Sequence, residues 1–193
     1  MKYFKISSVL CLISLVCAAL IAGFNMLTEP IIKANSARAE LEACQAIFAD
    51  YNQENSTELD ITGLDSRITK KVLAKNDKGE ELGYLYTVSG KNSYGVITLI
   101  VAIQNEEVYQ VELLENGQSF ADIVMSHLKS KYPSSKDNKV VIDPYNKPVD
   151  NPAVGSLDSN ALAGIDTKCG ATYGATLVKQ LVTAALDDAK GVR

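Results

Sequence analysis

The middle of the chain contains the stretch Gly83-Tyr-Leu-Tyr-Thr-Val-Ser89, followed closely by Val96-Ile-Thr-Leu-Ile-Val-Ala-Ile103. Both runs are rich in β-branched and aromatic residues and have the length of strands. A third run, Val108–Leu114, alternates apolar and polar residues at the two-residue period of a strand. Val72 and Leu73 indicate an earlier strand, and Gly- and Asn-containing turn signals separate all these runs. Because the connections are short, the pattern predicts an antiparallel sheet made of hairpins.

Helices are predicted after the sheet. Ser119–Lys131 fits a short helix, Leu177–Asp188 repeats apolar residues at helical spacing, and Tyr132–Ser159 reads as a loop with one short strand at Val140–Ile142. The residues expected to point inward from the first helix are Phe120, Ile123, Val124 and Leu128. A sheet followed by helices is an α+β arrangement, which we assign to residues 66–193.

The N-terminus has the features of a membrane anchor. Ile6–Thr28 is a run of 23 uncharged residues that follows Lys2 and Lys5. As a helix it spans roughly 34 Å, enough for the hydrocarbon core of a bilayer. A cleaved signal peptide is the alternative, since it shares the charged start and the apolar stretch. The length of the run and the lack of a small-x-small cleavage site before Glu29 favour an uncleaved anchor over residues 1–28.

The next segment, residues 29–65, is expected to hold the domain off the bilayer. It begins with an amphipathic helix that ends near Asp50 and continues as a polar loop over Asn52–Asp65. Two lysines precede the anchor, and Lys33 and Arg38 follow it. The distribution of positive charge therefore leaves the orientation of the anchor open.

Composition excludes several classes of function. The net charge is −4 and no basic run is present, which argues against nucleic-acid binding. Four cysteines and the single His127 form no CxxC pair and no Cys/His cluster, so no metal site is predicted. Cys169 with His127 lacks any local signature of a thiol nucleophile, and no catalytic residue is predicted. A disulfide between Cys44 and Cys169 is left open.

The segment before the last helix reads Asp166-Thr-Lys-Cys-Gly-Ala-Thr172. The free N–H groups and the positive dipole end of a helix start form a ready phosphate site. Gly170 and Ala171 allow a ligand to approach the backbone, and Thr172 supplies a hydroxyl. The alternative is structural, since Asp or Thr as a helix cap and Gly in a turn are common. The residues alone leave both interpretations open.

This segment resembles the Asp-x-x-Ser/Thr-Gly-Ala-Thr motif of the FMN-binding domain. That domain occurs in the RnfG component of the Rnf ion-translocating oxidoreductase and in the corresponding FMN-carrying component of the sodium-translocating NADH:quinone reductase. In the family, a flavin transferase uses FAD to esterify the last Thr of the motif with the FMN phosphate. The resemblance implies covalent FMN on Thr172, with Cys169, Gly170 and Ala171 beside it and Asp166 recognised by the transferase.

The resemblance extends beyond the motif. Leu27-Thr-Glu-Pro-Ile-Ile32 is similar to the start of RnfG proteins, and Gly83-Tyr-Leu-Tyr-Thr-Val-Ser-Gly90 to a Gly-Tyr strand of the family. Tyr94-Gly-Val-Ile-Thr-Leu resembles the following Gly-containing strand, and Val111-Glu-Leu-Leu-Glu115 resembles a strand that enters a Glu-Thr-Pro-Gly-like loop. Gly95 and Glu115 are therefore further candidate cofactor residues.

The family implies a single N-terminal transmembrane helix followed by an antiparallel-sheet FMN-binding domain with packed helices, on the extracytoplasmic side of the cell membrane. The expected role is that of a redox carrier that is not catalytic alone. Its expected partners are membrane lipid, a flavin transferase and the other membrane subunits of an Rnf-type ferredoxin:NAD oxidoreductase. The shortness of the chain favours RnfG over its counterpart in the quinone reductase.

The sequence departs from the family pattern at several positions. Cys169 replaces the usual Ser or Thr, Gly174 replaces a hydroxyl residue, and Asn116-Gly-Gln-Ser119 lacks the Thr-Pro-Gly of the family loop. A second Gly-Ala-Thr ends at Thr176, but Tyr173 precedes its glycine, and no Asp stands six residues before Thr176 as Asp166 does before Thr172. We therefore expect the flavin on Thr172.

Two other functions stay open at this point. One is an anchored extracytoplasmic binding or sensor module without flavin, and the other is a stand-alone flavoprotein in extracellular electron transfer. Tyr84, Tyr86 and Tyr94 either flank a flavin ring or simply pack as strand residues.

Overall fold

The computed structural model describes residues 2–134, 140–142, 148–150 and 154–191. The chain divides into two compact units, Met1–Ala39 and Glu40–Arg193. Helix α1, Lys2–Ile47, supplies the first unit, and its last turns from Glu40 onward belong to the second. The predicted helix end near Asp50 thus lies close to the observed one.

The first unit is a helix with an apolar surface. Helix α1 passes through Pro30 without ending. Its large apolar side chains between Ile6 and Ile32 are all exposed in the structure. The helix is long and apolar enough to cross a membrane. This agrees with the prediction of a single N-terminal transmembrane helix.

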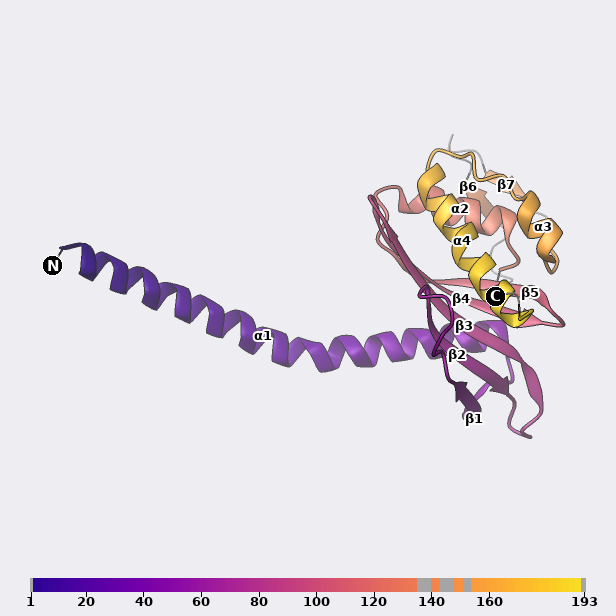
Figure 1. Ribbon diagram of the computed structural model, residues 1–193, viewed down its shortest axis with the longest axis horizontal. Helices are drawn as coiled ribbons and strands as arrows, with labels where there is room; N and C mark the ends of the chain where they lie inside the picture. The colour runs from indigo at the N-terminus through magenta and orange to yellow at the C-terminus, as the bar shows by residue number, and fades with distance from the viewer. Residues whose placement is uncertain (1, 135–139, 143–147, 151–153, 192–193) are drawn as a thin grey trace. The chain divides into compact units, whose positions relative to one another are not determined.

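The second unit is built on a five-stranded antiparallel sheet in the order β1-β2-β3-β4-β5 (Figure 1). The strands are β1 Asn52–Leu59, β2 Ile68–Lys75, β3 Glu81–Asn92, β4 Gly95–Gln104 and β5 Glu107–Asn116. Each strand pairs with the next one along the chain. The predicted meander of hairpins is therefore confirmed.

Strand β1 contradicts the prediction of a loop over Asn52–Asp65. Its sequence, Asn-Gln-Glu-Asn-Ser-Thr-Glu-Leu, has no apolar alternation, and most of its residues are exposed. An edge strand needs only backbone hydrogen bonds to one neighbour, and charged or polar side chains protect its open edge from other chains. The sheet therefore begins with a strand that hydrophobic pattern does not reveal.

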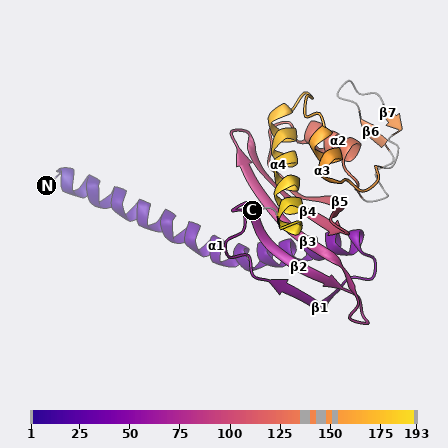
Figure 2. The same ribbon diagram turned by 45° about the vertical axis from the view of Figure 1, so that its right-hand side comes forward.

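Helices follow the sheet and cover one of its faces. They are α2 Ala121–Lys131, α3 Ser159–Gly164 and α4 Thr172–Ala189, and a separate hairpin joins β6 Val140–Ile142 to β7 Pro148–Asp150. Figure 2 shows α2 and α3 beside α4, which crosses β3 and β4. The predicted helices and the strand at Val140–Ile142 are confirmed, and the α+β class with them. Strand β7 was not predicted, nor was α3, which begins at the very end of the segment that we expected to be a loop.

Strand β4 is buried on both faces of the sheet, which explains its unbroken apolar run. Leu99 and Val101 pack under α4 in the main core, together with Val178 and Leu181. The alternate residues of β4, with the end of α1, form a second core on the opposite face. Its buried members are Cys44, Ile47, Phe48, Ala74, Leu85, Ile100 and Ala102.

Candidate functional site at the start of helix α4

Helix α4 begins without a side-chain cap. Its N-cap residue is Ala171, and no side chain of the described residues accepts a hydrogen bond as a cap of the first turn. No Asp or Thr of the motif therefore caps this helix, although Asp166 and Thr172 both bond within the turn that precedes it. The helix start keeps N–H donors and the positive end of the helix dipole, the two features that favour a phosphate.

The hydroxyl of Thr172 points back to the motif turn. Its Oγ1 donates to the carbonyl of Cys169 at 2.7 Å and accepts from the N–H of the same residue at 3.4 Å. Thr172 is exposed. Its hydroxyl is therefore held in place by its own turn while remaining accessible from outside.

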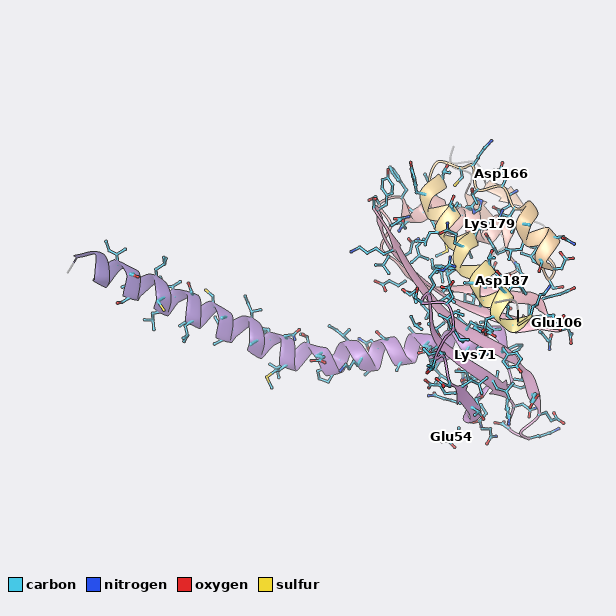
Figure 3. All side chains as sticks on the ribbon, viewed as in Figure 1. Glu54, Lys71, Glu106, Asp166, Lys179 and Asp187 are labelled. Carbon is cyan, nitrogen blue, oxygen red and sulfur yellow. The ribbon has the colours of Figure 1, made fainter. Side chains whose placement is uncertain are left out.

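Asp166 shapes the beginning of the same turn. Its Oδ1 accepts the N–H of Lys168 at 2.9 Å, the pattern of an Asx-turn. The backbone carbonyl of Asp166 receives a hydrogen bond from Nε2 of His127 at 2.9 Å. A carbonyl can only accept, so Nε2 carries the hydrogen. Asp166 itself is exposed, and Figure 3 labels it near the start of α4.

His127 lies on α2 and is buried. Burial lowers the pKa of its imidazole, while the hydrogen bond to Asp166 opposes that change and nearby Lys131 adds to it. Its other nitrogen, Nδ1, has no hydrogen-bond partner among the described residues. Burial thus favours the neutral form of His127, and its hydrogen bond to Asp166 supports the motif turn.

A pocket of about 230 Å³ opens at the start of α4. Five of its lining residues run consecutively from Gly170 to Gly174, and the other four come from earlier in the chain. They are Tyr94, Gln118, Phe120, Val124, Gly170, Ala171, Thr172, Tyr173 and Gly174. The volume lies below the roughly 300–1,000 Å³ of typical small-molecule sites, so the pocket suits part of a ligand that is also held elsewhere.

Exposed aromatic side chains border this pocket. The rings of Tyr94 and Tyr173 have centroids 5.4 Å apart and planes tilted by 33°. They are 43% and 68% exposed, and Phe120 is 55% exposed. The prediction that Phe120 points inward is thus wrong, because α2 begins one residue later, whereas Val124 and Leu128 are buried as predicted.

Two glycines allow close packing, one in the pocket and one next to it. A Cβ on Gly174 would lie 2.5 Å from Cγ2 of Val124, so α4 can meet α2 here only without a side chain. Gly95 has a φ of +142°, and a Cβ there would lie 2.0 Å from the carbonyl oxygen of Gly117. The carbonyl of Gly95 accepts the side-chain amide of Gln118 at 2.7 Å.

Comparison with known proteins gives a match in the first part of the chain. Residues 4–47 match the family model described as the RnfG N-terminal region. The predicted resemblance to RnfG is confirmed. No curated protein matches the chain. The match and the apolar helix α1 together identify a membrane-anchored protein similar to RnfG.

The structure brings together part of the predicted site. Thr172, Gly170 and Ala171 line the pocket. Asp166 and Cys169 shape the turn that leads to it through the hydrogen bonds described above.

Two further candidates stand outside the pocket lining. Gly95 supports Gln118. Glu115 accepts a hydrogen bond from Thr98 at 3.5 Å on the sheet. Their roles as cofactor ligands stay predictions.

The remaining tyrosines and cysteines are separated by the fold. Tyr86 is fully buried, and Tyr84 lies beside it, so of the three tyrosines considered only Tyr94 lines the pocket. Cys44 and Cys169 are both free. They pack on opposite faces of the sheet, which excludes the disulfide in this structure.

Five lining residues were not predicted as site residues, namely Gln118, Phe120, Val124, Tyr173 and Gly174. Tyr173 directly follows Thr172, the predicted attachment residue, and that position was the one available signal for it. Gln118, Phe120 and Val124 reach the pocket through tertiary packing.

Proposed function

We propose that this chain is a membrane-anchored electron-transfer subunit that carries FMN as a phosphoester on Thr172, within an Rnf-type ion-translocating ferredoxin:NAD oxidoreductase. One observation carries the proposal. The exposed Thr172 hydroxyl lies in the wall of a pocket bordered by aromatic side chains, at a helix start without a side-chain cap from the described residues.

The residues of the site fit the two chemical parts of FMN. A phosphate on Thr172 would lie beside the free N–H groups and the positive dipole of α4. The flat isoalloxazine ring requires apolar or aromatic surface, which Tyr94, Tyr173 and Phe120 offer. The pocket is too small for a freely bound cofactor of this size but is suited to a tethered one.

The register favours Thr172 over Thr176. Thr176 lies in the second turn of α4 and is half-buried, and its Oγ1 donates to Oγ1 of Thr167 at 3.2 Å. Thr172 is exposed, and its hydroxyl bonds to Cys169 in its own turn. A transferase can reach the first hydroxyl without unfolding the helix.

The modification balances as a phosphoryl transfer. Oγ1 of Thr172 attacks the FMN phosphorus of FAD, the P–O bond to the AMP phosphate breaks, AMP leaves, and the hydroxyl proton passes to a base of the transferase. The turn built by Asp166 presents the hydroxyl for this reaction. When bound, FMN supplies one- and two-electron chemistry, while the chain anchors and orients it.

The partners follow from the same proposal. Electrons arrive from and leave to other membrane subunits of the complex, and α1 holds the domain at the lipid bilayer. The resemblance to RnfG supports a domain on the extracytoplasmic side of the cell membrane. A covalent tether there prevents loss of FMN to the surrounding medium.

Intact mass tests the proposal. The full chain is coproduced with a flavin transferase in a host that exports the domain, and Thr172→Ala and Thr176→Ala variants are prepared in parallel. We expect a mass increase of one FMN residue in the parent chain and in Thr176→Ala, and none in Thr172→Ala. An unmodified parent chain would contradict the proposal and favour an anchored binding module without flavin.

Copurification of Rnf subunits from native membranes separates a member of the complex from a stand-alone flavoprotein.

A further inference from the structure

The two tyrosines at the pocket are brought together by a single side chain. Tyr94 lies in the turn between β3 and β4, and Tyr173 lies in the first turn of α4. Asn92, at the end of β3, accepts the N–H of Tyr94 on Oδ1 at 2.8 Å. Its Nδ2 donates to the carbonyl of Tyr173, 81 positions away, at 3.2 Å. Asn92 therefore fixes the backbones of both tyrosines relative to each other.

The aromatic surface that results is concentrated at this one place. Outside α1, the described residues include five large hydrophobic side chains that are exposed. Three of them, Tyr94, Phe120 and Tyr173, line the pocket, and the other two are Tyr84 and Tyr109. Exposed aromatic area that gathers around a pocket marks a binding site more often than scattered exposed residues do.

The floor of the pocket adds an oriented polar group. Gln118 is only 7% exposed, and its Nε2 donates a hydrogen bond to the carbonyl of Gly95 at 2.7 Å. That bond fixes the amide, so its Oε1 is available as an acceptor. Oε1 lies next to Gly174, 3.3 Å from the position that a Cβ would take there. Val124 supplies the apolar part of the same wall.

We propose that Tyr94 and Tyr173, together with Phe120, hold the isoalloxazine ring of the tethered flavin against the domain, and that Asn92 is the positioning residue of this aromatic clamp. The inference rests on the proposed function, because the ring is brought here by its phosphoester on Thr172. Tyr173 directly follows the attachment residue, and Tyr94 faces it with a ring centroid distance of 5.4 Å. Aromatic rings favour offset or tilted contact with a further flat ring.

The clamp has spectroscopic consequences that are independent of electron transfer to a partner. A phenol ring in contact with an excited isoalloxazine ring quenches its fluorescence by donating an electron. A ring fixed in chiral surroundings also gives a visible circular dichroism signal, which a freely rotating ring loses. Phenylalanine retains the aromatic face but is a much poorer electron donor. Leucine has neither the aromatic face nor the electron-donating phenol.

The test uses the full chain in detergent micelles, coproduced with the flavin transferase. Flavin content is measured by intact mass, and fluorescence yield and visible circular dichroism are measured per bound flavin. The variants are Tyr173→Leu, Tyr94→Leu, Tyr173→Phe and Asn92→Ala. Tyr109→Leu is the matched control, since Tyr109 is also exposed and stacks on another aromatic ring, that of Phe48 at 5.5 Å.

We expect each leucine variant to carry FMN, fluoresce more strongly and lose circular dichroism, with the ratio of docked to free ring falling roughly 2- to 10-fold per lost aromatic contact. Tyr173→Phe is expected to fluoresce more strongly while keeping its dichroism, and Asn92→Ala to follow the leucine variants more weakly. Tyr109→Leu should match the parent chain.

Two results overturn the inference. Flavinylated leucine and phenylalanine variants with the fluorescence and dichroism of the parent chain would remove the clamp and leave the proposed function intact. A parent chain without FMN mass would remove the proposed function and the clamp with it. If a leucine variant fails to accumulate, the Tyr173→Phe variant still decides, because brighter fluorescence with retained dichroism requires tyrosine contact.

Discussion

The two ends of helix α4 differ in how their polar groups are satisfied. At its C-terminal end, Asp188 accepts hydrogen bonds from Lys71 at 2.7 Å and from the hydroxyl of Tyr86 at 2.9 Å. Lys71 also lies over the Tyr86 ring, 5.1 Å from its centroid. At the N-terminal end, the Thr172 hydroxyl bonds within its own turn, and exposed aromatic rings line the same pocket.

This difference separates a structural end from the end that carries the proposed flavin site, the functional end. The polar groups at Asp188 are mutually satisfied and mostly buried, with 17% and 15% of the Lys71 and Asp188 side chains exposed. They fix the helix on the sheet. The start of the helix leaves donors, a hydroxyl and aromatic area accessible, as expected of a site that is completed by a ligand. Figure 3 shows Lys71 and Asp187 at one end of α4 and Asp166 at the other.

The largest expected effect is at the structural end. Asp188→Ala leaves the charge of Lys71 and the hydroxyl of Tyr86 without their partner in a mostly buried site, and we expect it to lower the free energy of unfolding by about 3 kcal/mol. Urea unfolding of the full chain in detergent, followed by tyrosine fluorescence, measures this. Asp187→Ala is the control, and its charge near Arg67 should contribute less than about 1 kcal/mol. Equal losses in both variants would contradict the distinction.

The functional end also has one position where packing is critical. Gly174→Ala places a Cβ 2.5 Å from Cγ2 of Val124, and we expect a loss of about 1–3 kcal/mol in the free energy of unfolding because α4 must move away from α2. Gly164→Ala in α3 is the control, since no atom lies within 4 Å of its added Cβ among the described residues. The same urea titration compares them. A neutral Gly174→Ala variant would show that the start of α4 is loosely packed.

The hydrophobic pattern predicted the central strand β4 correctly, but it missed the edge strand β1 and misplaced the start of helix α2. Strand β4 is apolar on both faces, so its sequence is unambiguous. Strand β1 is an edge strand with polar side chains, and its pairing with β2 depends on backbone groups that the sequence does not distinguish. Phe120 was assigned to a helix face although the helix starts at Ala121, and one residue at a boundary changed an inward side chain into an exposed one.

The candidate site was only partly accessible to the same reasoning. Thr172 and its neighbours form a local turn, and local turns are encoded by adjacent residues. The pairing of Tyr94 with Tyr173 depends on Asn92 and on where α4 crosses the sheet, which are tertiary properties. Gln118 could not be predicted as a site residue either, because its position depends on its hydrogen bond to Gly95 and on the close contact between Gly95 and Gly117.

Mild acid should destabilise the folded domain through His127, whose ring bonds to the motif turn. Burial lowers the pKa of His127, so the unfolded chain binds a proton more readily than the folded one. Stability is then complete above the ordinary histidine pKa of about 6.5 and decreases as pH falls below it. Thermal unfolding between pH 8 and pH 5 should show this decrease in the parent chain and a smaller one in His127→Gln. An identical pH dependence in both would exclude His127 as its source.

The smallest expected effect concerns the turn that presents Thr172. The carboxylate of Asp166 accepts the N–H of Lys168, and an Asn side chain can accept it equally well. We therefore expect Asp166→Asn to incorporate FMN like the parent chain, and Asp166→Ala to do so more slowly, since losing one exposed hydrogen bond costs only about 0.5–1.5 kcal/mol. Intact mass over time after addition of transferase and FAD measures the rates, with Lys168→Ala as the control because its backbone N–H is kept. Loss of incorporation in Asp166→Asn, with unchanged thermal stability, would instead show that the transferase reads the negative charge. The start of α4 would then be defined by recognition of a charge as well as by the shape of its turn.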